Sequence, residues 1–208
     1  MSPRRPDMPP LSRDDLPGDP LDLFGDWFRR AGEEAPLPEA VCLATADADG
    51  APDARMVLLK GFGPEGFRFF TNEGSAKGGQ LAASPVAALV FYWRELDRSV
   101  RVRGPVERVP DAEADEYFAS RDRSSRIGAW ASPQSRPLDS REDLDRLVAG
   151  VEKRFGDGEV ERPPHWGGYR VVPLSIEFWQ GQVARLHDRF RYMREAPGEP
   201  WSVTRLAP

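Results

Sequence analysis

Three residues near position 187 could form a site for a negatively charged ligand. Arg185, His187 and Arg189 are spaced two apart in the run Arg-Leu-His-Asp-Arg-Phe. Residues two apart on a β-strand project from the same face, so a strand over residues 185–193 would place two guanidinium groups beside an imidazole. The positive neighbours would keep that imidazole neutral. A solvated strand face can have the same spacing, so the pattern alone leaves both interpretations open.

Tyr117, Arg121 and Ser125 form a second candidate cluster. They are four residues apart, so a helix that continues through Ser125 would place them along one face. A guanidinium group with two hydroxyls is a suitable set of donors for a phosphate. An ordinary polar helix surface can have the same composition.

Basic residues in two further segments could also bind anions. Ser75 is a candidate N-cap for a helix over 75–84, and Lys77 adds a charge to the positive end of that helix, which would suit a phosphate. Arg55 and Lys60 lie five apart on one predicted strand, so they face opposite sides unless a bulge intervenes. They could serve two ligands or two subunits.

Other motifs for chemistry are absent or lie in the wrong context. The run Gly61-Phe-Gly63-Pro-Glu-Gly66 matches the dinucleotide motif G-x-G-x-x-G, but the residues that follow it predict a strand and not the required helix. We therefore interpret it as a hairpin connection. One cysteine, Cys42, and two histidines argue against a Cys/His zinc site, so we expect no metal. A single cysteine also fits a reducing cytoplasm.

Closely spaced strands must position most of these residues. Runs rich in β-branched and aromatic residues predict strands over 40–46, 53–60, 66–71, 86–93, 99–109, 169–172, 175–180, 185–193 and 201–206. Helices are predicted from Leu21 to just before Pro36 and over 75–84, 111–121 and 139–155. Short antiparallel strands at these intervals favour a barrel. We predict a single α+β domain over 21–208, preceded by a proline-rich, mobile arm over 1–20.

Composition limits the partners that the chain could have. It has 208 residues and a formal net charge of -5, which argues against a general nucleic-acid surface. The longest apolar run, Val86–Trp93, is far shorter than the ~20 residues that span a bilayer. The N-terminal residues lack the apolar stretch of a signal peptide. We expect a cytoplasmic protein that binds neither membranes nor nucleic acid.

Six runs together resemble the pyridoxine/pyridoxamine 5′-phosphate oxidase family, over nearly the whole chain from about Asp15 to the final Leu-Ala-Pro. They are RMVLLKGF, FFTNEGSAKGGQL, RIGAWASPQS, HWGGYR, IEFWQG and RLHDRF, in this order and with this spacing. The resemblance implies a mostly antiparallel, FMN-binding split β-barrel with flanking helices. It also implies a homodimer in which two subunits build each of two FMN sites at their interface.

The resemblance implies a role for each matching residue. Arg185 and His187 would be the catalytic residues that face the substrate ring. The substrate phosphate would be held by Lys60, Tyr117, Arg121 and Ser125. The FMN contacts would fall on Arg55, Met56, Val57, Leu58, Leu59, Lys60, Phe70, Thr71, Lys77, Ser99, Gln134, Ser135, Trp179 and Arg189.

Three positions depart from the family pattern. Ala76 stands where many members have an arginine near the FMN phosphate, so Lys77 and Arg55 would carry more of that charge. Ser99 stands where a glutamine usually contacts the flavin ring. The N-terminal residues read Pro3-Arg4-Arg5-Pro6 and lack the Arg-x-x-Tyr that can close over the substrate. Without this segment to close over the substrate, the protein would bind the family's substrate more weakly, or it would be a relative with another substrate.

The resemblance implies an oxidase that converts pyridoxine or pyridoxamine 5′-phosphate to pyridoxal 5′-phosphate. Hydride would pass from the substrate C4′ to flavin N5, and O2 would then be reduced to H2O2, with no side chain needed as a strong base. One alternative is a related flavin oxidase of secondary metabolism, of the phenazine-pathway type, with a substrate that lacks phosphate. Another is a flavin- or pyridoxal-phosphate-binding module without turnover. Lys60, Tyr117, Arg121 and Ser125, which would hold a substrate phosphate and are here called the phosphate clamp, favour the conversion of the phosphorylated substrates.

Overall fold

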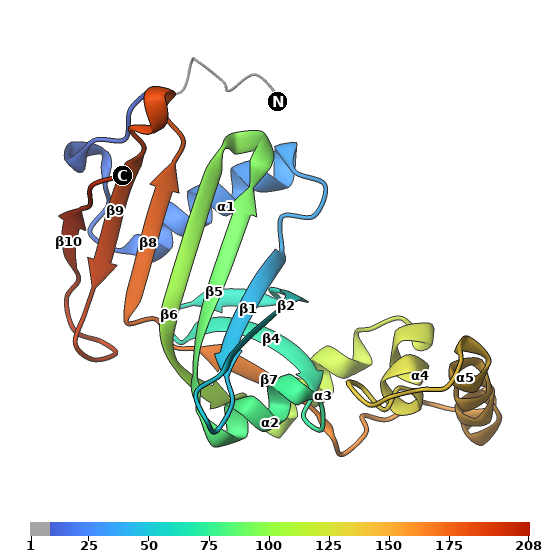
Figure 1. The fold of residues 1–208 in the computed structure, drawn as a ribbon. Coiled ribbons are helices and arrows are strands. Elements are labelled where there is room, and N and C mark those ends of the chain that lie inside the picture. Colours follow the sequence, from blue (N-terminus) through green and yellow to red (C-terminus); the bar gives the residue numbers. More distant parts are fainter. Residues whose placement is uncertain (1–8) are drawn as a thin grey trace.

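The computed structural model describes residues 9–208, in which an antiparallel sheet curls into a partly open barrel (Figure 1). Its larger part has the strand order β10-β9-β8-β6-β5-β1-β2, and β4 and β7 continue it from the far end of β6. β6 pairs with β8 through residues 98–103 and with β7 through residues 106–108, so it links the two parts. The strands are β1 (Ala40–Ala46), β2 (Pro52–Leu58), β3 (Gly61–Gly63), β4 (Gly66–Asn72), β5 (Val86–Trp93), β6 (Arg98–Arg108), β7 (Trp166–Val171), β8 (Ser175–Gln180), β9 (Asp188–Met193) and β10 (Ser202–Arg205).

Helices flank this sheet. The α-helices are α1 (Pro20–Glu34), α2 (Ala76–Ala83), α3 (Asp111–Ala119), α4 (Arg123–Ala131) and α5 (Arg141–Phe155), and three 3-10 turns are η1 (Arg13–Asp15), η2 (Arg94–Leu96) and η3 (Val183–Arg185). The fold class predicted from the sequence, an α+β split barrel of mostly antiparallel strands, is confirmed. In the part of the chain that the structure describes, no helix is long and apolar enough to cross a membrane.

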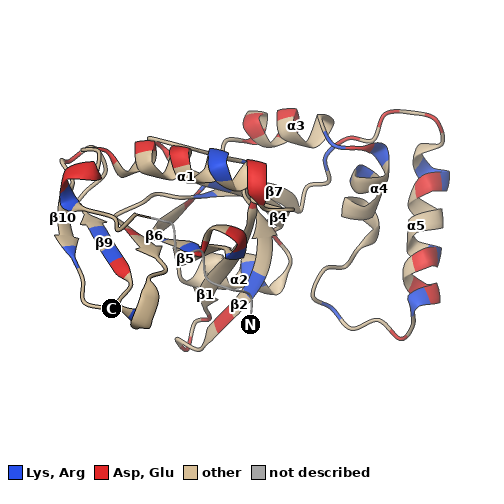
Figure 2. Cartoon of the chain, turned by 90° about the horizontal axis from the view of Figure 1, so that it is seen from above, with Lys and Arg blue, Asp and Glu red and all other residues tan. Residues whose placement is uncertain are grey.

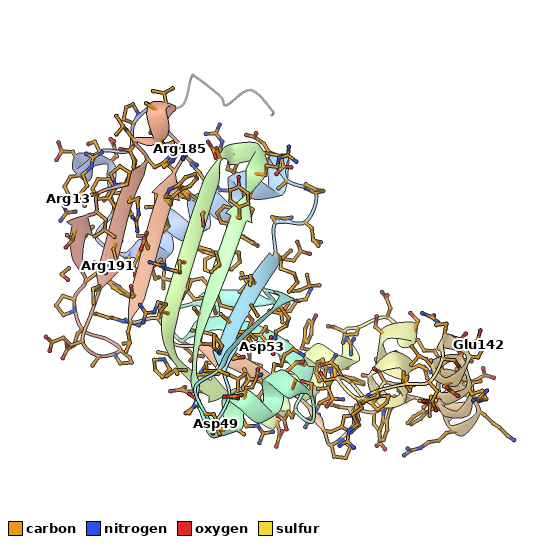
Figure 3. The ribbon with its side chains drawn as sticks, viewed as in Figure 1. Arg13, Asp49, Asp53, Glu142, Arg185 and Arg191 are labelled. Atoms are coloured by element: carbon orange, nitrogen blue, oxygen red, sulfur yellow. The ribbon has the colours of Figure 1, made fainter. Side chains whose placement is uncertain are left out.

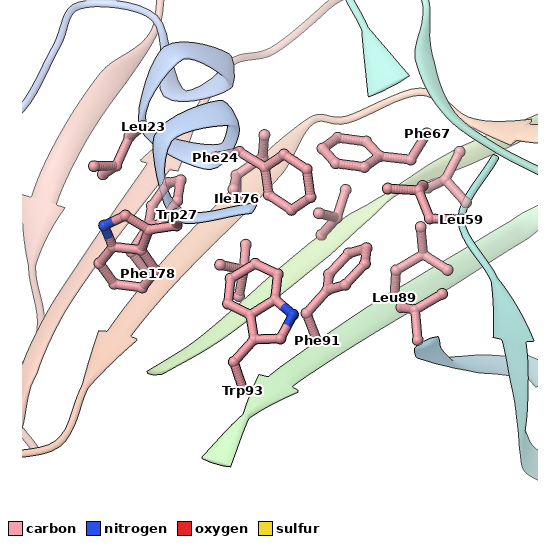
Figure 4. Packing of buried hydrophobic residues seen from close by; sticks show 14 of the residues in the cluster. Leu23, Phe24, Trp27, Leu59, Phe67, Leu89, Phe91, Trp93, Ile176 and Phe178 are labelled. Carbon is pink, nitrogen blue, oxygen red and sulfur yellow. The ribbon is translucent and has the colours of Figure 1, made fainter. Parts of the chain in front are cut away.

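The main core lies between α1 and the inner face of the sheet (Figure 4). Asp19 caps α1 by accepting a hydrogen bond from the Leu21 N–H, and Pro20 occupies its first turn, which suits its fixed φ. The ring of Phe24 is fully buried and meets the rings of Phe67 and Phe91 edge-on, at 4.9 and 5.1 Å between centroids. Aromatic pairs in this geometry stabilise a core beyond the apolar area that they bury.

A smaller apolar cluster holds α3 and α4 against β7 and β4. Phe118, Ile127, Val160 and Trp166 form its buried part. The helix pair α4–α5 extends away from the barrel (Figure 2), and α5 buries none of its residues fully, as expected for a surface helix. This cluster fixes the position of α3 and α4 beside the barrel, where the candidate site lies.

The G-x-G-x-x-G run forms a hairpin and not a dinucleotide loop. β3 pairs with β4 in the register Gly61 to Arg68 and Gly63 to Gly66, as the sequence predicts. Gly66 has a φ of +131°, and a Cβ atom there would lie 2.5 Å from the Val171 carbonyl oxygen. The turn therefore requires glycine at this position.

The predicted mobile arm is packed against the domain in its described part. Leu11 is 9% exposed and belongs to the core, and its N–H donates to Asp188 Oδ2 at 3.0 Å. The Tyr192 hydroxyl donates to the Pro17 carbonyl oxygen at 2.8 Å. Apolar burial and hydrogen bonds to the sheet thus hold residues 9–19, which the count of prolines could not reveal. The rest of the predicted arm, residues 1–8, lies outside the described residues.

Candidate functional site

A cavity of about 450 Å³, here called cavity A, opens between β2, β4, α2 and the α3–α4 pair. Its volume lies in the range of small-molecule sites. It collects eleven of the residues that the sequence singled out. These are Met56, Val57, Leu58, Lys60, Phe70, Thr71, Lys77, Tyr117, Arg121, Ser125 and Gln134.

Arg121 supplies cavity A with a cation that has an unused donor. Its Nη1 is buried and has no hydrogen-bond partner among the described residues. The guanidinium carbon lies 5.0 Å from the ring centroid of Trp166, which supports the side chain from one side. Burial lowers the pKa of Arg121, partly opposed by Tyr117, yet arginine stays charged at neutral pH. A buried cation with a free donor is suited to an anion from outside the chain.

Trp166 also belongs to a group of stacked aromatic rings in the wall of cavity A. The Phe70 ring lies 4.2 Å from that of Tyr117 and 5.4 Å from that of Trp166, centroid to centroid, and the Tyr117 and Trp166 rings lie 6.1 Å apart, all three with nearly parallel planes. The stack fixes the ring of Tyr117 at the edge of the cavity. It holds rigidly one of the two hydroxyls that the sequence places beside Arg121.

The helix predicted over 111–121 does not continue through Ser125, as an alignment of Tyr117, Arg121 and Ser125 on one helix face would require. α3 ends at Ala119, α4 begins at Arg123, and Ser120–Asp122 turn the chain between them. The spacing of four residues therefore does not align the three side chains on one helix face. Tyr117, Arg121 and Ser125 nevertheless line the same cavity, because the turn folds α4 back toward β4.

Lys77 forms a second basic corner of cavity A. Its side chain is buried, and its Nζ donates to Gln134 Oε1 at 2.8 Å and to Ser75 Oγ at 3.3 Å. Burial, and then the positive charge of Arg55, lower its pKa, while Asp53 raises it. Ser75 is the N-cap of α2, as predicted, and accepts from the Gly78 N–H. An anion here would meet Lys77 and the positive end of α2 together.

Six residues expected to contact a cofactor do not line cavity A, and three of them, Arg55, Leu59 and Ser135, lie in neither cavity. Arg55 lies beside it and donates to Gln80 Oε1 of α2 at 2.8 Å and to Thr45 and Asp53. Leu59 is 5% exposed, with its side chain in the main core. Ser135 is exposed in the turn after Gln134, with a φ of +70°.

A second cavity of about 410 Å³, cavity B, lies on the outer face of the sheet and holds Ser99, Trp179 and Arg189. Its other lining residues are Val90, Tyr92, Arg101, Glu177 and Pro208. The Ser99 hydroxyl donates to the Phe91 carbonyl oxygen at 2.8 Å. Arg189 donates to Glu177 and to the Ala207 carbonyl oxygen. Cavity B is thus lined by side chains from β5, β6, β8 and β9, and its three charged residues come from β6, β8 and β9.

Arg185 and His187 do not lie on a strand, which corrects the argument from alternating residues. β9 begins at Asp188, and the preceding residues form the turn η3. Ala184 and Arg185 both have a positive φ, 54° and 63°, a strained conformation for residues other than glycine. The Gln182 N–H donates to His187 Nδ1 at 3.1 Å, so this nitrogen accepts and Nε2 is left to donate. The imidazole lies 4.6 Å from the Trp179 ring, beside cavity B.

Within one chain, the predicted site is divided between two places. Arg185 lies near the upper end of the sheet in Figure 3, whereas Asp53, close to Arg55 on β2, lies in its lower half beside α2. The residues expected to hold the substrate phosphate line cavity A, whereas the His187 ring contacts Trp179 of cavity B and Arg185 precedes it by two residues. Each region offers only part of the predicted set.

The sequence reasoning did not select several residues of these cavities. Trp166, Asn72 and Ser132 line cavity A, and Arg101 and Glu177 line cavity B. The run Ser99-Val-Arg101-Val-Arg103 alternates, and this pattern alone could have placed Arg101 beside Ser99. The buried carboxylate of Glu177 gives no comparable signal, because an isolated acidic residue in a strand is common on solvated faces.

The fold defines the chain as a split-barrel α+β protein, with one basic cavity at the edge of the barrel and another on the outer face of its sheet. Residues 31–154 match the family described as Pyridoxamine 5′-phosphate oxidase, and residues 166–208 match its Pyridoxine 5′-phosphate oxidase C-terminal dimerisation region. The chain belongs to the pyridoxine/pyridoxamine 5′-phosphate oxidase family, and the resemblance of the six sequence runs is confirmed.

Curated relatives and solved structures agree with this assignment. The pyridoxine/pyridoxamine 5′-phosphate oxidase of Azorhizobium caulinodans is 56% identical and that of Maricaulis maris 58% identical, each over 91% of this chain and over 90% and 86% of the relative. PhzG from Burkholderia lata 383, solved with tetrahydrophenazine-1-carboxylic acid, is 32% identical with a TM-score of 0.86, over 94% of this chain and 95% of that chain. An FMN-binding relative from Nostoc punctiforme has a TM-score of 0.74 at 16% identity, over 93% of this chain and 100% of that chain, and shows the fold alone.

Proposed function

We propose that the protein is an FMN-dependent oxidase that converts pyridoxine or pyridoxamine 5′-phosphate to pyridoxal 5′-phosphate, with O2 as the electron acceptor. The single observation that carries the proposal is the unused buried donor of Arg121 in cavity A. Lys60, Tyr117 and Ser125 line the same cavity and add a second cation and two hydroxyls. Together they supply the charge and donors that a phosphate monoester requires.

The residues of cavity A also fit the phosphate of FMN, at the corner formed by Lys77 and the start of α2. Lys77 is 8% exposed and makes no ion pair within residues 9–208, so its charge is available to a ligand. Bound FMN would supply the redox chemistry by accepting hydride from the substrate and passing electrons to O2. The protein residues would bind the substrate phosphate, orient the ring and hold the proton on His187 Nε2.

Lys77→Ala is expected to weaken FMN binding by about tenfold to a hundredfold, because a charge-assisted hydrogen bond contributes about 1.5–3 kcal/mol. Ala76 brings no second charge to the corner, so Lys77 carries more of the affinity. The measurement is the dissociation constant of FMN for the apoprotein, from the quenching of flavin fluorescence. Lys153→Ala on the exposed face of α5 is the matched control and should leave that constant unchanged. Equal affinity in Lys77→Ala and the parent protein would refute the assignment.

We propose that a homodimer joins the two parts of the site, with cavity A of one subunit facing cavity B and the Arg185–His187 turn of its partner. Support comes from the division of the predicted residues between two places and from the match of residues 166–208, which include β8 and β9, to a dimerisation region. Light scattering should therefore show a dimer, and the flavin absorbance should correspond to one FMN per subunit. A monomer with full flavin occupancy would contradict this arrangement.

Mixing two variants of strongly reduced activity tests the shared site directly. Arg121→Leu damages cavity A, and Arg185→Leu damages the turn beside cavity B. If each site uses both subunits, a mixed dimer has one site with both changes and one intact site. Unfolding and refolding an equal mixture should then restore about one quarter of the parent activity. No recovery, although mixed dimers are shown to form, would place both halves in the same subunit.

An alternative function is oxidation of a substrate that lacks phosphate. The structural likeness to PhzG, solved with an aromatic carboxylic acid, favours it. Arg121 could pair with a carboxylate as well as with a phosphate, but a carboxylate does not need the additional cation and hydroxyls of cavity A.

An anaerobic titration separates these functions. Pyridoxine 5′-phosphate should bleach the yellow absorbance of the FMN-loaded protein, and air should restore the colour with formation of H2O2. Bleaching by an aromatic carboxylate and not by the phosphorylated vitamers would favour the PhzG-like function. A stable spectrum with every substrate would indicate a binding module without turnover.

A further inference from the structure

Glu177 on β8 is a buried carboxylate between two arginines at the wall of cavity B. Its side chain is 7% exposed. Oε1 accepts from Arg189 Nε at 3.0 Å and from Arg189 Nη2 at 2.7 Å, and Oε2 accepts from Arg101 Nη2. A buried carboxylate with both oxygens engaged fixes its partners much more firmly than a solvated one.

The direction of this carboxylate is informative, because it makes no bond to a cation that stands directly opposite it in the strand register. In the strand register, Glu177 stands directly opposite Arg101 on β6 and Arg191 on β9. It nevertheless bonds to Arg189, its diagonal neighbour toward cavity B, while the buried Nε of Arg191 has no partner among the described residues. If Glu177 served only to neutralise a neighbouring charge, Arg191 would be a suitable partner. The carboxylate instead fixes the orientation of the Arg189 guanidinium group.

The bonds to Arg189 leave some of its donors available. Three of its five N–H groups are used, two by Glu177 and one by the Ala207 carbonyl oxygen at 2.9 Å. Two N–H groups remain free for a ligand. The contacts with Glu177 and with the Ala207 carbonyl oxygen hold the guanidinium group in one orientation. Two arginines against one carboxylate also leave cavity B with a net positive charge.

We propose that Glu177 is a positioning residue, which holds the guanidinium of Arg189 in the orientation that binds the cofactor across the subunit interface. This inference rests on the proposed function, in which Arg189 contacts FMN. Glu177 acts through Arg189 and does not itself meet the ligand. Its effect on FMN binding should therefore vanish when Arg189 is removed.

The test is a double-mutant cycle on the dissociation constant of FMN, measured with the full-length apoprotein. Glu177→Gln keeps the size of the side chain and removes its charge. It should weaken FMN binding by about tenfold in the parent protein, because the fork is no longer fixed by a charged acceptor. In the Arg189→Leu background, the same change should alter the constant by less than about twofold.

Arg191→Leu provides the matched control, since Arg191 is the direct neighbour of Glu177 on β9 but makes no bond to it. In that background, Glu177→Gln should still cost about tenfold. A purely structural role of Glu177 predicts the same loss in all three backgrounds, and that result would overturn the proposal.

If Glu177→Gln does not fold, Arg189→Lys tests the same geometry. It keeps the positive charge but cannot offer two parallel N–H groups to one carboxylate oxygen, so FMN should bind about tenfold more weakly. Unchanged affinity in Arg189→Lys would overturn the positioning role. Failure of the parent protein to bind FMN would instead remove the proposed function itself, and with it this inference.

Discussion

Arg185→Leu is expected to lower kcat by about a hundredfold while leaving the FMN content unchanged. The side chain projects from the turn before β9 and makes no hydrogen bond or ion pair to other described residues, so its charge is available to a substrate. Holding the reacting carbon in place contributes strongly to rate, and an error of about 1 Å can cost a hundredfold. Steady-state kcat and the flavin absorbance of the purified variant are the two measurements.

Two further substitutions serve as comparisons for Arg185→Leu. His187→Asn should lose about tenfold, because an amide oxygen can still accept from the Gln182 N–H and its NH2 can still donate to the substrate. Lys153→Ala, on the exposed face of α5, should retain parent activity. If His187→Asn abolished turnover while Arg185→Leu did not, the histidine would be an essential acid or base and the orientation account would fail.

Pyridoxine without its phosphate is expected to react with a kcat/KM about a hundredfold to ten-thousandfold below that of its phosphate. Two cations of cavity A, Arg121 and Lys60, would each lose a charge-assisted hydrogen bond worth about 1.5–3 kcal/mol. Binding energy from this remote group also orients the reacting carbon, so kcat should fall along with affinity.

The Arg121→Leu variant shows whether cavity A is responsible. Leucine keeps the apolar contact with Trp166 but removes the charge, so the preference for the phosphorylated substrate should shrink by about tenfold to a hundredfold. Ser124→Ala, at an exposed neighbour outside the cavity, should keep the full preference. Equal kcat/KM for both substrates in the parent protein would show that the phosphate does not bind in cavity A.

Local sequence patterns predicted nine of the ten strands and four of the five α-helices of the described residues, because hydrophobic periodicity reflects which face is buried. The short strand β3 and the helix α4 were not predicted. β1, β5 and β8 have the predicted limits, 40–46, 86–93 and 175–180. The N-cap at Ser75 and the hairpin at Gly66 also follow from local rules of capping and positive φ. These features depend on residues close together in the chain.

Predictions failed where a polar segment changes its backbone conformation. The alternation of Arg185, His187 and Arg189 continues through the end of a turn, so the pattern predicted a strand that begins three residues too early. Likewise, the polar run from Ser120 to Asp122 has no apolar periodicity to show that α3 ends there. Spacing also gave no sign that cavity A and the Arg185 turn lie apart, since that division depends on contacts between distant segments.

The turn at Ala184 and Arg185 implies a trade-off between folding stability and activity. Two consecutive non-glycine residues at positive φ cost on the order of 1–3 kcal/mol each, and burial elsewhere in the domain must offset this. Glycine at position 184 would relieve part of that cost and raise the free energy of unfolding. It would also widen the range of directions open to Arg185. Substitutions chosen to stabilise the protein would therefore include this turn, and at this position we expect them to lower turnover.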